Sequence, residues 1–159
     1  MSAQTIAQEK GQQQIDALHL LYSLLSQEGS LVLTLLQKLG VDVDALKKKT
    51  DSHITKIPTM LTPTSFGQFY LTQDMAKVLE KARQESVAMG DEFISVEHLF
   101  LALLDTKSLA KEVLEKTTFF NHASEAGTVK ASKLDYETVL KMLSQIRGGQ
   151  RITDPEPES

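Results

Sequence analysis

Apolar side chains recur at spacings of three and four residues through most of the chain, and this period predicts amphipathic helices. No segment of convincing length alternates apolar and polar residues, and the only β-like fragment is the short stretch from Phe66 to Leu71. The pattern therefore predicts an all-α fold. The clearest helical stripes are Leu31, Val32, Leu35, Leu36 and Leu39; Met75, Val78, Leu79 and Ala82; and Tyr136, Val139, Leu140, Leu143 and Ile146.

Short polar side chains stand just before the predicted helices, where an oxygen can accept a hydrogen bond from an otherwise unpaired backbone N–H. Gly40 and Gly90 stand where helices are expected to stop. These signals divide the chain into helices separated by short turns. The predicted N-caps are Asp16, Ser30, Asp42, Thr72, Ser95, Ser108 and Asp135.

The chain contains an internal repeat: residues 11–25 match residues 90–104 at a constant offset of 79, with Gly, Ile, His and three Leu coinciding. After one residue is dropped, the match continues from Ser30 and Leu31 to Leu36 and Lys38, over Ser108, Leu109, Leu114 and Lys116. Two copies of one helical unit are implied. We predict two pseudo-symmetric four-helix repeats packed together.

The repeats set the expected organisation. The domain should span residues 1–147, with repeat one at about 3–53 and repeat two at about 72–147. Pro58, Pro63 and Gly67 interrupt any helix in the connector, residues 54–71. An extra stretch, residues 117–133, has no counterpart in repeat one and is expected to be a mobile loop. Residues 148–159 are polar, acidic and proline-rich, which is typical of a flexible linker.

Composition narrows the function. A chain of 159 residues suits one domain, and the absence of cysteine excludes a disulfide framework and fits a cytoplasmic location. No apolar stretch approaches the roughly 18 residues of a membrane span. The net charge is −4, and the one compact basic run, Lys47 to Lys49, is more typical of a solvated helix face than of a phosphate site. We expect neither a membrane nor a nucleic acid as partner.

Catalytic and metal-binding motifs are missing from the sequence. There is no Gly-x-x-x-x-Gly-Lys-[Ser/Thr] loop for nucleotide phosphates, no His pair with zinc-ligand spacing and no Gly-x-Ser-x-Gly elbow. A calcium loop beginning at Asp42 fails because Lys47 and His53 occupy the positions that need Gly and Glu. His19 and His98 stand three residues after their predicted caps and are expected to pack or cap. The sequence predicts a binding module, without an enzyme activity, cofactor or metal of its own.

The seam between two helical repeats is the predicted binding surface. Aliphatic side chains along such a seam, with acidic residues at its rim, could hold apolar segments of another polypeptide. Val78 and Leu79 are candidates for the apolar wall, and Asp91, Glu97 and His98 are candidates where the next helix begins. The structural alternative stays open: the aliphatic pair can belong to the core, Asp91 can solvate a loop, and Glu97 can be a first-turn charge favoured by the helix dipole.

The paired Gly-x-x-x-Ile-x-x-x-His-Leu units, the connector Gly67 to Thr72 and the exit Ile146 to Pro155 together resemble the Clp amino-terminal domain family, and the exit resembles its ClpB branch in particular. The resemblance implies an accessory domain that binds unfolded or aggregated polypeptides and presents them to a homohexameric, ATP- and Mg-dependent threading motor. It implies a monomer for the isolated domain, with Asp91 and Glu97 flanking a groove and Leu79 in its wall. The first helix is shorter than is usual in the family, and the stretch 117–133, with Phe119 and Phe120, is longer.

An alternative is a ClpC-like module that docks adaptors or proteins marked with phosphoarginine. Such a site would place acidic residues at equivalent positions of both repeats, to face guanidinium groups. The counterparts of Asp91 and Glu97 are Gln12 and Leu18, which weakens a symmetric version. A third possibility, nucleic-acid binding, would depend on Lys47 to Lys49 and would show a steep salt dependence.

Overall fold

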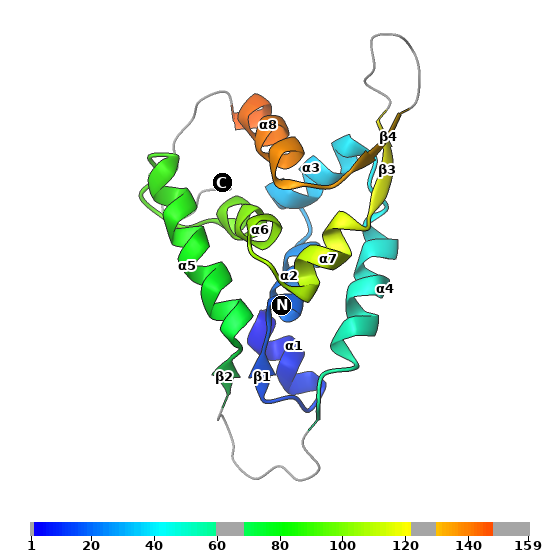
Figure 1. Ribbon diagram of the computed structural model, residues 1–159, viewed down its shortest axis with the longest axis vertical. Helices are drawn as coiled ribbons and strands as arrows, with labels where there is room; N and C mark the ends of the chain where they lie inside the picture. Colours follow the sequence, from blue (N-terminus) through cyan, green and yellow to red (C-terminus); the bar gives the residue numbers. More distant parts are fainter. Residues whose placement is uncertain (1, 60–68, 122–129, 148–159) are drawn as a thin grey trace.

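The computed structural model describes residues 2–59, 69–121 and 130–147, which form two sets of four helices (Figure 1). The predicted all-α fold of paired four-helix repeats is confirmed. Repeat one contains α1 (Ala3–Glu9), α2 (Ala17–Leu25), α3 (Leu31–Leu39) and α4 (Val43–Ile54). Repeat two contains α5 (Gln73–Ala88), α6 (Val96–Asp105), α7 (Leu109–Glu115) and α8 (Tyr136–Arg147).

Helices α2 to α8 begin at the capping residues that the sequence predicted. Six of the seven side chains accept a hydrogen bond from a backbone N–H in the first turn, and Ser95 holds the seventh N-cap position with an extended backbone. Gly40 ends α3 in the left-handed region, at φ 86°, which glycine adopts without strain. Local capping chemistry therefore fixes where each helix starts.

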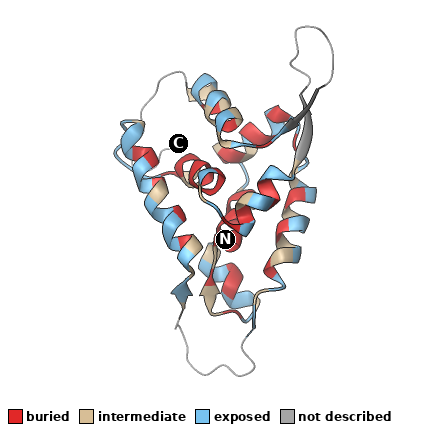
Figure 2. Cartoon of the chain, viewed as in Figure 1, coloured by how far each residue is buried: buried red, intermediate tan, exposed pale blue. Residues whose placement is uncertain are grey.

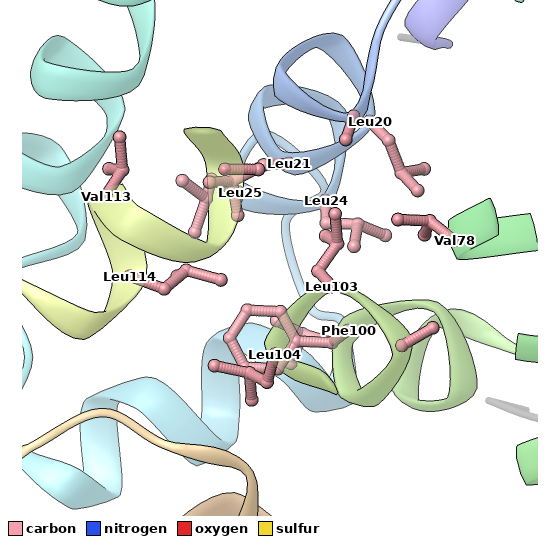
Figure 3. Packing of buried hydrophobic residues seen from close by; sticks show 14 of the residues in the cluster. Leu20, Leu21, Leu24, Leu25, Val78, Phe100, Leu103, Leu104, Val113 and Leu114 are labelled. Atoms are coloured by element: carbon pink, nitrogen blue, oxygen red, sulfur yellow. The ribbon is translucent and has the colours of Figure 1, made fainter. Parts of the chain in front are cut away.

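Helices α2 and α6, the counterparts of each other in the two repeats, lie in the centre of the molecule and contact one another. Both are buried around almost their whole circumference (Figure 2). Leu21 and Leu24 of α2 meet Phe100 and Leu103 of α6 in one apolar cluster that continues into both repeats (Figure 3). The two repeats therefore share a single core.

Two short strand pairs accompany the helices, and the sequence pattern pointed to only one of these strands, through the β-like fragment from Phe66 to Leu71. The dipeptide β1 (Gln14–Ile15) pairs in parallel with β2 (Tyr70–Leu71) at the end of the connector. Strands β3 (Thr118–Asn121) and β4 (Lys130–Lys133) form an antiparallel ladder between α7 and α8. The expectation of a wholly irregular stretch at 117–133 was thus wrong for its two ends, because backbone pairing there does not need alternating side chains. Residues 60–68, 122–129 and the predicted linker 148–159 lie outside the described residues.

Candidate peptide-binding site

The five predicted site residues lie on α5, on the α5–α6 turn and at the start of α6, but only one of them is exposed. Leu79 has 36% of its surface accessible, whereas Val78 and His98 are at 0%. Asp91 and Glu97 are at 8% and 5%. Leu79 is therefore the only one of these five side chains that a partner could contact without a change in the structure.

The seam between the repeats is filled by the protein's own side chains. Val78 of α5 points toward the leucines of α2, and Phe100 and Leu103 of α6 occupy the remaining space (Figure 3). The prediction of an open apolar crease is corrected here: helices α2 and α6 bury their apolar faces against each other, and the acidic residues lie inside rather than at a rim.

Asp91 is the centre of a buried ionic network. Its Oδ2 lies 2.7 Å from Nε2 of His98, and its Oδ1 accepts a hydrogen bond of 2.7 Å from Nη2 of Arg147, at the end of α8. The side chains of Asp91 and His98 are fully buried and that of Arg147 is 11% exposed. A carboxylate beside an imidazole is also an arrangement of acid–base catalysis, but a sealed pair has no access to substrate. The network ties the α5–α6 turn to the end of the last helix.

The equivalent residues of repeat one form a second network of the same shape. Nε2 of His19 lies 2.6 Å from Oε1 of Gln12, and the amide of Gln12 donates to the carbonyl oxygens of Ile54 at 2.7 Å and Ile57 at 3.2 Å, at the end of α4. In each repeat, then, the residue after a left-handed glycine joins the histidine of the second helix to the end of the fourth.

Both histidines complete capping boxes, as the sequence predicted for a packing or capping role. Nδ1 of His19 accepts a hydrogen bond of 2.9 Å from the backbone N–H of Asp16, and Nδ1 of His98 accepts one of 2.8 Å from that of Ser95. Because Nδ1 accepts, each neutral ring carries its proton on Nε2 and donates it to Gln12 or Asp91. Burial lowers the pKa of His19 despite the nearby carboxylate of Asp16, so its ring stays neutral in the fold.

Glu97 differs from Asp91 in how its carboxylate is satisfied. Its Oε2 is buried without a hydrogen-bond partner in the described part of the chain. Repeat one has Leu18 at the same position, 1% exposed. An unsatisfied buried carboxylate oxygen is costly, so Glu97 is the least well accommodated of the predicted residues.

Two polar contacts, one helical turn apart on the same side of α5, hold this helix against α8 and α6. The hydroxyl of Tyr136 on α8 donates to both carboxylate oxygens of Glu85, at 2.8 and 2.9 Å, and burial together with this carboxylate raises the pKa of the tyrosine. Nζ of Lys81 lies 2.9 Å from Oδ2 of Asp105 on α6, and this hydrogen bond raises the pKa of the lysine. These contacts tie α5 to α6 and α8, while Leu79 of the same helix is exposed.

An exposed apolar pair that the sequence pattern did not predict lies on the turn before α6. Phe93 and Ile94 are 39% and 47% exposed, although repeat one has the half-buried Gln14 and the 8% exposed Ile15 at these positions. The signal was available in the repeat comparison, because a phenylalanine replaces a glutamine at an equivalent turn. Other large apolar side chains with exposed surface are Tyr70, Leu71, Val87 and Leu109.

The basic run of α4 sits among carboxylates. Lys47 lies over the ring of Tyr22, with Nζ 5.4 Å from its centroid, and shares an open depression of about 290 Å³ with Asp44 and Asp51. Asp51 also pairs with Lys10 at 2.6 Å. Mixed charge at this surface does not favour a phosphate backbone as ligand. Within the described residues, no helix combines the length and apolar character needed to cross a bilayer.

The fold and its buried networks define a duplicated, all-helical module that stabilises itself through equivalent contacts in each half. Comparison with known proteins places it more closely. The model of the family "Clp repeat (R) N-terminal domain" matches residues 1–117, and the chain belongs to this family.

Relatives and solved structures agree with this assignment. The chain is 31% identical to the chaperone protein ClpB of Bacillus anthracis over 160 residues, covering 100% of this chain but 17% of that protein. It is 32% identical to ClpB 1 of Parasynechococcus marenigrum, covering 100% of this chain and 16% of the relative. The chain therefore spans only 17% and 16% of the length of these two relatives.

The Hsp104 N-terminal domain from Candida albicans has a similar fold, with a TM-score of 0.77 at 22% identity, covering 99% of this chain and 92% of that one. The N-terminal domain of ClpV1 from E. coli gives a TM-score of 0.65 at 17% identity, covering 92% of this chain and 80% of that one. The predicted resemblance to the Clp amino-terminal domain is confirmed.

Proposed function

We propose that this module is the substrate-binding accessory domain of a ClpB-type disaggregase, which engages unfolded or aggregated polypeptides and presents them to an ATP-driven hexamer. Its similarity along the whole chain to ClpB chaperones supports this role. In this proposal the module binds and does not catalyse, and ATP and Mg belong to the parent protein.

The observation that carries the proposal is the set of exposed apolar side chains on the face of α5 and the turn that follows it. Leu79, Phe93 and Ile94 offer apolar surface to solvent while the core beneath them is closed. Surface of this kind suits weak, sequence-tolerant contacts with apolar segments of an unfolded chain. We retain Leu79 from the sequence prediction and add Phe93 and Ile94. The buried Val78, Asp91, Glu97 and His98 would act by positioning them.

The ClpC-like alternative gains no support from the geometry. A phosphoarginine site needs carboxylates that a guanidinium group can reach, and the carboxylate of Asp91 is sealed and bound to Arg147. Gln12, its counterpart, is 2% exposed and uses its amide within repeat one.

An isotope-shift titration tests the proposed function. The ¹⁵N-labelled chain is mixed with reduced, carboxymethylated α-lactalbumin, which is permanently unfolded, and with the disulfide-intact protein as the matched folded control. We expect saturable shifts around Leu79, Phe93 and Ile94 with the unfolded form only. Shifts with neither form at millimolar concentration, or equal shifts with both, would contradict the proposal.

A further inference from the structure

The two repeats treat one equivalent turn in different ways. In repeat one the turn before α2 forms β1, and the connector lies along it as β2 in parallel register. The backbone N–H groups of Tyr70 and Thr72 donate to the carbonyl oxygens of Gln13 and Ile15, at 3.1 Å each. The hydroxyl of Thr72 then donates to Oδ1 of Asp16 at 2.6 Å and fastens the end of the added strand.

The counterpart in repeat two has no strand beside it among the residues that the structure describes. Residues 92–94 bend at Glu92 and Phe93, and their backbone N–H and C=O groups make no hydrogen bond to any described residue. Ser95 stands where Asp16 stands, with its hydroxyl 3.1 Å from Nδ1 of His98. The carbonyl oxygens of Glu92 and Ile94, the counterparts of the two acceptors in repeat one, therefore accept no backbone hydrogen bond within the described residues.

Apolar surface is uncovered in the same place. Ile15, Ala17 and Leu20 of repeat one are 8%, 0% and 7% exposed beside β2 and α5. Their counterparts Val96 and Leu99 are only partly buried, and Ile94 is 47% exposed. An extended segment that paired with residues 92–94 would cover this surface, as the connector and α5 do in repeat one.

We propose that residues 92–94 are a pairing edge, to which an extended apolar segment of an unfolded client adds in parallel, in the way that β2 adds to β1. This inference rests on the proposed function and names how the client is held. Main-chain hydrogen bonds would supply an affinity that does not depend on client sequence, and Phe93 and Ile94 would select segments with neighbouring aromatic and aliphatic residues. The protein's own segment at this position in repeat one, Tyr70–Leu71–Thr72, is a template for such a client.

The inference is tested with a synthetic peptide that copies residues 69–75, Phe-Tyr-Leu-Thr-Gln-Asp-Met. N-methylation of the peptide at the tyrosine or the threonine removes the two N–H donors that the template uses. N-methylation at the leucine removes an N–H that takes no part in the backbone pairing of repeat one, and it is the matched control. We expect the first two changes to weaken binding at least about tenfold, because each deletes a main-chain hydrogen bond, and the third to change it by less than about threefold. Equal effects of all three methylations would overturn strand addition.

Protein variants locate the site independently. Phe93→Ser and Ile94→Ser should weaken peptide binding, whereas Val87→Ser, at a 65% exposed position outside the turn, should not. If unfolded α-lactalbumin binds normally to both turn variants, the pairing edge is wrong while the proposed function stands. If α-lactalbumin binds to no form of the chain, the proposed function itself fails. Concentration-dependent dimerisation that Ile94→Ser abolishes would show that the occupant is a second copy, and would overturn the client assignment.

Discussion

The buried networks around His19 and His98 solve one structural problem with different chemistry. In both repeats a residue after the helix-ending glycine must satisfy the histidine Nε2–H and also hold the end of the fourth helix. Gln12 does both with one neutral amide, because its oxygen accepts from the ring and its NH₂ donates to backbone carbonyls. Asp91 can only accept, so its second partner must be a donor, and Arg147 supplies it.

This difference predicts unequal sensitivity to mutation. A buried ion pair contributes little net stability when intact, but removing one partner leaves the other charge in a low-dielectric environment. A neutral amide that is lost leaves only unsatisfied neutral groups. Removing a residue from the network of repeat two should therefore lower the free energy of unfolding more than removing its counterpart in repeat one.

Removal of the Asp91 carboxylate is the largest expected effect. Asp91→Ala should lower the free energy of unfolding by about 3 to 5 kcal/mol, because the guanidinium of Arg147, which is only 11% exposed, loses a charged partner and the buried ring of His98 loses its acceptor. Urea denaturation followed by circular dichroism measures it. The double variant Asp91→Gln with Arg147→Met, which copies the neutral chemistry of repeat one, should recover most of this loss. A double variant as unstable as Asp91→Ala would refute the charge argument.

Removal of the equivalent amide should cost less. Gln12→Ala leaves the carbonyl oxygen of Ile54 and Nε2–H of His19 without their partner, and we expect a loss of about 1 to 3 kcal/mol. The same denaturation experiment applies. A loss equal to or greater than that of Asp91→Ala would show that the two networks do not differ in the way their charges suggest.

Glu97 allows the comparison to be sharpened by a stabilising change. Glu97→Leu places in repeat two the residue that repeat one has as Leu18 and removes the buried, unpartnered oxygen. We expect a gain of about 1 kcal/mol, smaller than the desolvation cost alone because a first-turn carboxylate also interacts favourably with the helix dipole. Glu112→Leu, in the exposed first turn of α7, is the matched control and should give no gain. A destabilised Glu97→Leu would mean that the carboxylate has a role in the fold.

The repeat pattern and the caps made the helices predictable, because an N-cap and an apolar stripe act within a few residues of sequence. The candidate site was less predictable. Asp91 and Glu97 are charged, and charged residues are usually exposed, but the partner that allows Asp91 to be buried is Arg147, at a sequence separation of 56. Strand β2 lies within the β-like fragment that the sequence showed, but its partner β1 escaped notice for the same reason, since a ladder of two residues depends on a partner far along the chain. The seam between the repeats is filled because α2 and α6 are apolar on nearly every face. The sequence displays this feature, but it is overlooked when both helices are interpreted as amphipathic.

The smallest expected effect concerns pH and isolates His19. Burial lowers the pKa of this ring below 6.5 in the folded state, so the unfolded chain binds more protons in the range just below pH 6.5. Stability should therefore be full above that value and fall as the pH decreases, because protonation of Nδ1 would break its hydrogen bond from the backbone of Asp16. His19→Gln keeps a side chain that can close the capping box but cannot titrate, and it should flatten the dependence of unfolding free energy on pH between 7.5 and 5. His53→Gln, which removes a histidine outside both networks, is the control. If the slope is unchanged in His19→Gln, groups other than His19 cause the acid sensitivity. His19 and His98 would then share a geometry, but the geometry of His19 would make no contribution to the pH dependence.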